Sequence, residues 1–350
     1  MTTFTEPAAV VAWFGAVQAQ DYLGALWAVG LRLSGDARER DVERALSERS
    51  IVRSWPMRGT LHFLAAADAR WMLELLAPRV ATAATKRLRA LGIDDNVLSR
   101  ARRALVKELE GNRQLTRSAA YSALGRARVP TQGERGLHVL WRLAHEGLIC
   151  FGAREGKQQT FVLLEEWLPR AKRRARDEAW AELARRYFTA HGPATLRDFA
   201  WWTGTTLAEA RSATALAGKS IEQEVMGDET YYFADAEPQA RSGRTPKRAH
   251  VLPAFDEFFV GYADRGAAVD PAHAQRLSAF DLLASVALLD GRLVGTWKRR
   301  IVGERVLLAT RLLAPLAPAN ATALRRALER YARFLELSPA FHAAHPRPLG

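Results

Sequence analysis

Hydrophobic and polar positions follow a recurring order along the chain, in which amphipathic helices are followed by two short strands. The clearest run spans residues 97–168. Apolar residues recur at helical spacing in VLSRARRALVKELEG (97–111), TRSAAYSALGRAR (116–128) and TQGERGLHVLWRLAHEG (131–147), and Thr116 is the expected N-cap of the second helix. LICFG and TFVLLEEW, on either side of the polar stretch AREGKQQ, predict a strand, a turn and a strand. Three helices followed by a hairpin are the pattern of a winged helix-turn-helix motif.

The same order recurs in residues 177–237 and, more loosely, in residues 5–65. In the later copy, three helices precede SIEQEV and ETYYFA, which flank a Gly227-Asp228 turn. In the earlier copy, Asp41 is a candidate cap of the third helix. A hairpin is then expected from IVRSW, a turn at Pro56-Met57, and RGTLHFL, before a helical connector over residues 66–96.

The last third of the chain has a different pattern. GRLVGTWKRRIVGERVLLATRLL (291–313) alternates like a β-meander, and ATALRRALERYARFLEL (321–337) has helical spacing. We therefore expect an α+β fold, mainly helical, with three tandem winged helix-turn-helix motifs and a C-terminal β-rich segment. The expected domains are the first motif with its connector (1–96), the second motif (97–168), the third motif (169–237) and the C-terminal segment (238–350).

Charge adds a class of partner to this picture. The chain has 51 Lys and Arg against 38 Asp and Glu, a net charge of +13, which favours a polyanion such as nucleic acid or an anionic membrane surface. Basic residues gather in residues 97–135, in PRAKRRAR (169–176), in ARSGRTPKRAH (240–250) and in WKRR (297–300). The candidate DNA-binding residues from the last two clusters are Lys247, Arg248, Lys298, Arg299 and Arg300. The alternative for any single cluster is a solvated helix face, which is the more frequent use of charged runs.

Other classes of protein are not favoured. The single cysteine excludes an internal disulfide, the N-terminus lacks the pattern of a signal peptide, and apolar runs are too short to span a membrane, so a soluble cytoplasmic protein is expected. The common phosphate-loop, zinc-protease, nucleophile-elbow and dinucleotide motifs do not occur in the sequence. We expect no cofactor and no metal.

Two glutamines, Gln18 and Gln20, lie inside the apolar stretch AVQAQDYLGALWAVGLR (16–32). In a helix these side chains would point to nearly opposite sides, whereas in a strand or tight turn they would point the same way. Amides in apolar surroundings are costly unless they are hydrogen-bonded. The pair therefore belongs either to a structural network that joins the first helix to the next, or to a site that holds a polar group such as water.

Four short motifs occur in a specific order: QAQD after the first helix, RGTLHFL in the first hairpin, then LPAFDEFFVGYADR and LVGTWKRR. In this order, and over nearly the whole chain, they resemble the AlkZ-like members of the winged-helix DNA glycosylase superfamily. The resemblance implies three winged helices arranged as a C around a DNA-sized channel. It also implies a monofunctional glycosylase with a catalytic Gln-Φ-Gln signature, which falls on Gln18 and Gln20. The related YcaQ branch has Asp at the third place, where this chain has Gln20.

The resemblance also implies a substrate: double-stranded DNA with cationic N7- or N3-alkyl purines, including bulky adducts or interstrand crosslinks, in repair or self-resistance to a genotoxin. A base that already carries positive charge leaves without strong acid catalysis, so two amides that position a water are sufficient chemistry. The protein would act as a monomer at the nucleoid, without a membrane partner. Two other hypotheses remain open: a non-enzymatic transcription regulator and a protein-interaction module.

Two further stretches match the family. Arg58 and His62, in RGTLHFL, would lie beside the glutamines, where Arg58 binds a phosphate and His62 contacts the sugar or water. Asp256, Glu257 and Arg265 are interpreted as a salt-bridged element of the fold.

Overall fold

The computed structural model describes residues 4–168, 174–234, 248–274, 277–278 and 283–342. The first part of the chain forms three helices and a hairpin, followed by two connecting helices. These elements are α1 (Pro7–Phe14), β1 (Val17–Gln18), α2 (Tyr22–Gly30), α3 (Glu39–Ser47), β2 (Ile51–Met57), β3 (Thr60–Ala65), α4 (Ala66–Ala83) and α5 (Thr85–Ala90).

Two further runs of helices and strands follow. The first consists of α6 (Asp95–Leu109), β4 (Leu115–Thr116), α7 (Arg117–Arg126), α8 (Arg135–His145), β5 (Ile149–Phe151), β6 (Thr160–Leu163) and α9 (Leu164–Trp167). The second consists of α10 (Arg176–His191), α11 (Leu196–Thr203), α12 (Leu207–Ala217), η1 (Gly218–Ser220), β7 (Glu222–Met226) and β8 (Glu229–Phe233). As predicted, the Thr116 hydroxyl caps α7, because it accepts the Ala119 N–H at 3.3 Å.

The C-terminal part is built on a sheet, which confirms the expected α+β class. Its elements are β9 (Ala249–Leu252), α13 (Glu257–Val260), η2 (Gly266–Ala268), α14 (Pro271–Ala274), β10 (Val286–Leu289), β11 (Arg292–Val302), β12 (Arg305–Leu312), α15 (Pro318–Phe334) and β13 (Ser338–His342). None of the helices in the described ranges is long and apolar enough to cross a membrane.

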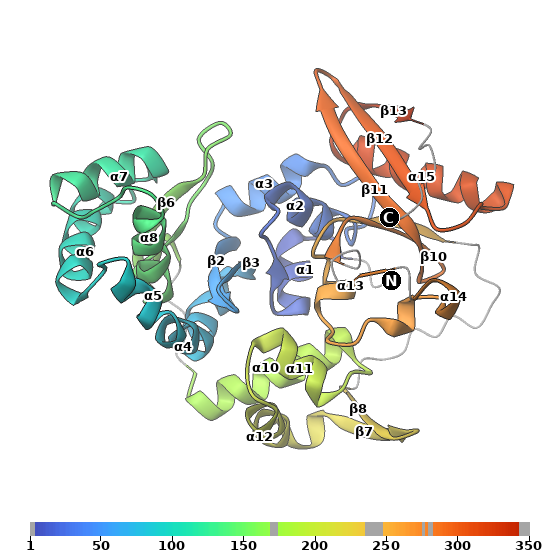
Figure 1. Cartoon of the computed structure of the whole chain (residues 1–350), viewed down its shortest axis with the longest axis horizontal. Helices are drawn as coiled ribbons and strands as arrows, with labels where there is room; N and C mark the ends of the chain where they lie inside the picture. Colours follow the sequence, from blue (N-terminus) through green and yellow to red (C-terminus); the bar gives the residue numbers. More distant parts are fainter. Residues whose placement is uncertain (1–3, 169–173, 235–247, 275–276, 279–282, 343–350) are drawn as a thin grey trace.

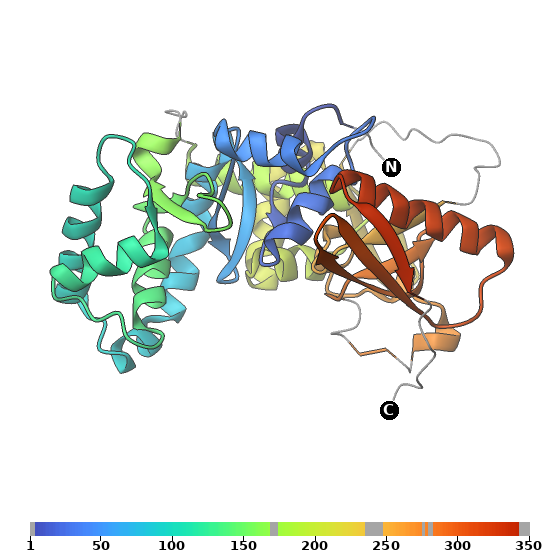
Figure 2. The ribbon, with the colours of Figure 1, turned by 90° about the horizontal axis from the view of Figure 1, so that it is seen from above.

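Three sheets organise the strands. One has the order β1-β3-β2-β5-β6-β4 and joins the hairpin of the first part to that of the second, where Arg53 of β2 pairs with Phe151 of β5. The C-terminal sheet has the order β13-β12-β11-β10-β9, and β7 and β8 pair only with each other. Figures 1 and 2 show α6–α8 at one end of the molecule, the C-terminal sheet at the other, and α1–α3 between them.

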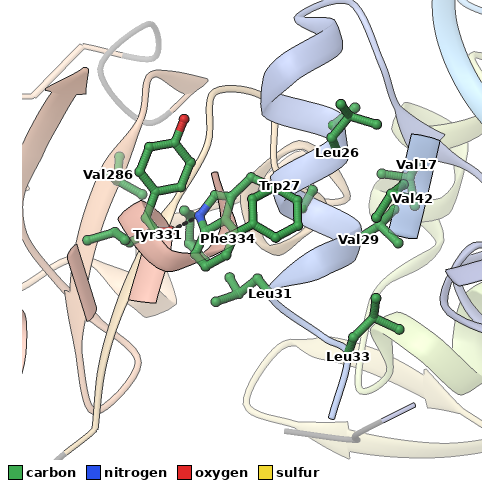
Figure 3. Packing of buried hydrophobic residues seen from close by; sticks show 14 of the residues in the cluster. Val17, Leu26, Trp27, Val29, Leu31, Leu33, Val42, Val286, Tyr331 and Phe334 are labelled. Atoms are coloured by element: carbon green, nitrogen blue, oxygen red, sulfur yellow. Dashed lines mark hydrogen bonds between the residues drawn. The ribbon is translucent and has the colours of Figure 1, made fainter. Parts of the chain in front are cut away.

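The N-terminal helices share a core with the C-terminal sheet and α15. Trp27 of α2 packs against Tyr331 and Phe334 of α15, with ring centroids 5.1 Å apart in both pairs (Figure 3). The two helices approach so closely that a Cβ at Gly30 would lie 2.2 Å from the Phe334 ring, so only glycine fits there. Burial of these aromatic rings fixes α1–α3 against the last third of the chain.

Three local predictions need correction. The first hairpin turns at Arg58-Gly59 and not at Pro56-Met57, because Arg58 and Gly59 have φ of +54° and +70°, as a tight hairpin turn requires. Asp41 is at the third position of α3, where its carboxylate accepts the Arg38 N–H at 2.8 Å instead of capping the helix from outside. Residues 164–167 form the short helix α9 and do not extend the preceding strand.

Candidate active site

The glutamine motif follows an extended path along the β2–β3 hairpin. Gln18 is opposite His62 in the antiparallel pair of β1 and β3, and the Ala19 N–H donates to the Leu61 carbonyl at 2.7 Å. Extended backbone places alternate side chains on the same side, so Gln18 and Gln20 point the same way. Of the helix and the strand considered from the sequence, the structure has the strand arrangement. Both glutamine side chains accordingly meet groups of this hairpin.

Two buried charged residues hold the motif from other directions. Arg53 of β2 donates to the Ala19 carbonyl from Nε at 3.1 Å and from an Nη at 2.8 Å. The carboxylate of Glu257, in α13, accepts the Gln18 N–H at 2.9 Å. The main chain of residues 18–20 is therefore fixed by β3, β2 and α13 together, a rigid support of the kind that an active site needs.

The two amide groups differ in exposure, and the oxygen of each accepts one hydrogen bond from the hairpin. Gln18 is only 7% exposed, and its Oε1 accepts from Arg58 Nη2 at 3.3 Å. Gln20 is exposed, and its Oε1 accepts the Leu61 N–H at 3.2 Å. A carbonyl oxygen has two lone pairs, so each glutamine retains one acceptor position for a water.

Arg58 and His62 lie beside Gln18, as the family resemblance implied. Arg58 Nη2 is 3.1 Å from His62 Nε2, and His62 Nδ1 is 3.0 Å from the Thr60 carbonyl. A guanidinium can only donate hydrogen bonds and a carbonyl can only accept them. The imidazole therefore donates from Nδ1 to the Thr60 carbonyl and accepts at Nε2 from Arg58. Arg58 is set in place by its turn and by Gly204, where a Cβ would lie 3.1 Å from the Arg58 Cγ.

This environment keeps His62 uncharged. The imidazole is fully buried, and burial together with the Arg58 charge lowers its pKa from 6.5 to about 3. The site therefore presents a neutral ring next to Gln18 at physiological pH.

The shifted pKa predicts how stability depends on pH. Between pH 6.5 and 3 the unfolded chain protonates His62 and the folded chain does not, so the free energy of unfolding falls as the pH falls through this window. At pH 5 the loss relative to pH 7 is about 2 kcal/mol. His62→Gln lacks this loss, so urea unfolding should show the gap between wild type and variant shrinking by about 2 kcal/mol from pH 7 to pH 5. A gap that is the same at both values would contradict a neutral His62.

Glu257 joins the motif to α10 and α11, a role that sequence reasoning missed. It is 1% exposed; its Oε2 accepts from Trp202 Nε1 at 2.9 Å and lies 3.5 Å from His191 Nε2. Burial alone would raise the pKa of the carboxyl, but contact with His191 and the charge of Arg58 outweigh it and lower the pKa. The signal available in the sequence was that Glu257 lies in the apolar stretch FDEFFV. This position does not identify the partner of Glu257 or the side to which its carboxylate points.

The other two residues of the stretch that matches the family, Asp256 and Arg265, have other partners. Asp256 forms a bidentate buried ion pair with Arg32, at 2.7 and 2.9 Å, so the expected salt bridge exists but with a residue of the first part of the chain. Arg265 donates from Nε to the Phe259 carbonyl at 2.8 Å and stacks its guanidinium on Trp201.

The other candidate basic residues are far from the glutamines in sequence, and three of them, Lys298, Arg299 and Arg300, lie on β11. Lys298 and Arg300 are exposed on one face. Arg299 points the other way, where its guanidinium is 3.5 Å from Asp21 Oδ2 and covers the Tyr331 ring. Arg248 is exposed next to β9, and Lys247 lies outside the described residues.

Comparison with known proteins gives the family and the fold of the chain. An interstrand DNA cross-link repair glycosylase of Streptomyces sahachiroi is 28% identical over 312 residues, which are 84% of this chain and 83% of the relative. The structure of the Streptomyces sahachiroi DNA glycosylase AlkZ has the same fold, with a TM-score of 0.75, 23% identity, and coverage of 97% of this chain and 94% of that one. The sequence pattern of the family described as DNA glycosylase AlkZ-like matches residues 11–334, which include the glutamine motif and Glu257. With a match over nearly its whole length, this chain belongs to the AlkZ-like DNA glycosylase family.

Proposed function

We propose that this DNA glycosylase excises cationic N7- and N3-alkyl purines from duplex DNA, including bulky adducts and interstrand crosslinks. The observation that carries the proposal is the pair of amide oxygens of Gln18 and Gln20, which the β2–β3 hairpin fixes at the end of β1. One lone pair on each oxygen is available to a water. Neither glutamine position supplies a carboxylic acid that could protonate a leaving base.

The chemistry matches such a site. In a cationic alkylpurine, the C1′–N9 bond breaks with its electron pair going to the base, which leaves as a neutral molecule. Water adds to C1′ and releases a proton to solvent, so the product is an abasic site. Carbonyl oxygens stabilise the positive charge that moves to the sugar in the transition state, and a neutral His62 adds no opposing charge.

We further propose that the three helix–hairpin units are winged helices arranged as a C around the duplex, and that the enzyme acts as a monomer at the nucleoid. Lys298 and Arg300, exposed on β11, supply positive charge for the phosphates. The β7–β8 hairpin carries Glu222, Glu224, Asp228 and Glu229, and phosphates would repel it. We therefore place the wing of the third unit outside the contact with DNA.

The substrate class is tested with three duplexes: one with N7-methylguanine, one with uracil, and one crosslinked through N7 of two guanines. We expect heat-labile abasic sites from the first, none from the second, and separated strands from the third, because the leaving group of uracil is neutral before cleavage and needs acid catalysis. Efficient uracil release would contradict the mechanism. Release of N7-methylguanine without unhooking would restrict the enzyme to simple adducts, in repair and not in self-resistance to a crosslinking agent.

A further inference from the structure

Glu257 satisfies a backbone group that the sheet leaves unpaired. β1 is the edge strand of the six-stranded sheet, and along it the Ala19 N–H faces β3 while the Gln18 N–H donates to Glu257 Oε1 at 2.9 Å. Successive N–H groups of a strand point to opposite sides, so the Gln18 N–H points away from β3 when the Ala19 N–H faces it. Its partner comes from 239 residues later in the chain.

Burying a carboxylate at this position is energetically unfavourable by itself. Burying a charge costs several kcal/mol unless hydrogen bonds and opposite charges offset it. Glu257 is 1% exposed, and both of its oxygens are used: Oε1 by Gln18 and Oε2 by Trp202. A hydrogen bond to a charged acceptor is roughly twice as strong as a neutral one, so this residue holds two separate segments more firmly than an amide could.

The segment that follows Glu257 is itself clamped against α10 and α11. The Tyr187 hydroxyl donates to the Gly261 carbonyl at 2.9 Å, and Trp201 Nε1 donates to the Val260 carbonyl at 3.1 Å. A Cβ at Gly261 would lie 2.5 Å from the His191 ring, so this packing is tight. The Glu257 carboxylate therefore cannot drift with respect to α11.

We propose that Glu257 is a positioning residue for base release: it fixes the Gln18 backbone, and through it the amide that holds the attacking water. The proposal rests on the catalytic role proposed for Gln18. Glu257 acts through Gln18 and does not touch the substrate, so its removal should slow the chemical step without weakening DNA binding.

The test is a double-mutant cycle of Glu257→Gln and Gln18→Ala on a duplex with one N7-methylguanine. Glu257→Gln keeps the shape but retains only one acceptor oxygen, so either the Gln18 N–H or the Trp202 N–H faces an amide NH₂. Gln18→Ala removes the side-chain amide but keeps the backbone N–H that donates a hydrogen bond to Glu257. We expect Glu257→Gln to reduce the single-turnover rate about tenfold in the wild-type background and less than twofold in the Gln18→Ala background, with duplex Kd unchanged within about twofold.

Asp198→Asn is the matched structural control. Asp198 is also a buried carboxylate that fixes the same segment, since its Oδ1 accepts the Ala263 and Asp264 N–H groups at 2.9 and 3.3 Å, but it has no contact with the glutamines. We expect Asp198→Asn to lower Tm while the rate of the folded enzyme stays within about twofold of wild type. If both variants lose activity only in proportion to unfolded protein, Glu257 is merely structural and the proposal fails.

The remaining outcomes separate this inference from the proposed site. If Gln18→Ala slows base release and folded Glu257→Gln does not, only the role of Glu257 is wrong. If Gln18→Ala is fully active, the role of Gln18 is wrong and that of Glu257 with it. Equal tenfold losses in both backgrounds would mean that Glu257 acts independently of Gln18, which also overturns the proposal. If Glu257→Gln fails to fold, Glu257→Asp is used instead, because it keeps the charge but is one methylene too short to reach the Gln18 N–H. Full activity of Glu257→Asp would also overturn the proposed positioning role of Glu257.

Discussion

Gln20→Ala is expected to reduce the single-turnover rate of N7-methylguanine release at least about tenfold, which corresponds to about 1.4 kcal/mol of barrier. The substitution removes one of the two carbonyl oxygens proposed to hold the water. The amide is exposed and its contact with the Leu61 N–H can be replaced by solvent, so Tm should change little. Duplex Kd, measured on the same preparation, should stay near the wild-type value because the lost interaction stabilises the transition state.

Two variants make this result specific. Gln223→Ala removes another exposed glutamine amide, on β7, and should leave the rate unchanged. Gln20→Asp introduces the carboxylate found in the YcaQ branch, and should keep or raise activity on simple N7-alkylguanine because a carboxylate also orients water and favours a cationic transition state. If Gln20→Ala stays folded and fully active, the catalytic motif has been placed on the wrong residues.

Asp256→Ala should lower the free energy of unfolding by about 3–5 kcal/mol, the cost of leaving a buried charge without its partner. Arg32 is 9% exposed and faces Asp256 through two hydrogen bonds at 2.7 and 2.9 Å, so water cannot replace the carboxylate. Urea unfolding at pH 7 provides the measurement. Glu329→Ala, which breaks the exposed Arg325–Glu329 pair at 3.2 Å, is the control and should change stability by less than about 0.5 kcal/mol.

The double variant Arg32→Met/Asp256→Leu extends the argument. It removes both charges together and replaces them with apolar side chains of similar size, so it should recover much of the stability lost in Asp256→Ala. A double variant as unstable as the single one would show that packing around this pair, or the cap that Asp256 Oδ1 provides for α13 by accepting the Phe258 N–H at 3.0 Å, dominates the loss, and not the stranded charge.

Local signals predicted the local structure well. Thr116 was identified as a cap from its position before an apolar helix, and the helices of all three runs were predicted from apolar spacing and local start and stop signals, because all of these depend on neighbours in the sequence. The turn at Arg58-Gly59 was misplaced because Pro56 is normally a turn residue, whereas here it lies in β2 where the register with β3 shifts.

The candidate site was only partly accessible from the sequence. The glutamines, Arg58 and His62 were found as members of short motifs that resemble a family. Arg53 and Glu257, which hold the backbone of the motif, act across 34 and 239 residues, and no spacing rule links them to it. A charged residue within an apolar stretch, as in IVRSW or FDEFFV, was the available indication that a buried partner exists.

The packing of Trp27 on α15 bears on how the chain folds as it is made. Tyr331 and Phe334 leave the ribosome about 300 residues after Trp27, which at ordinary translation speed is on the order of 15–60 seconds later. During that interval α1–α3 lack the rings that cover them, whereas the helices of residues 95–145 already have most of their own core. We therefore expect the middle section of the nascent chain to complete its core first, while the N-terminal apolar surface stays uncovered until α15 has been synthesised.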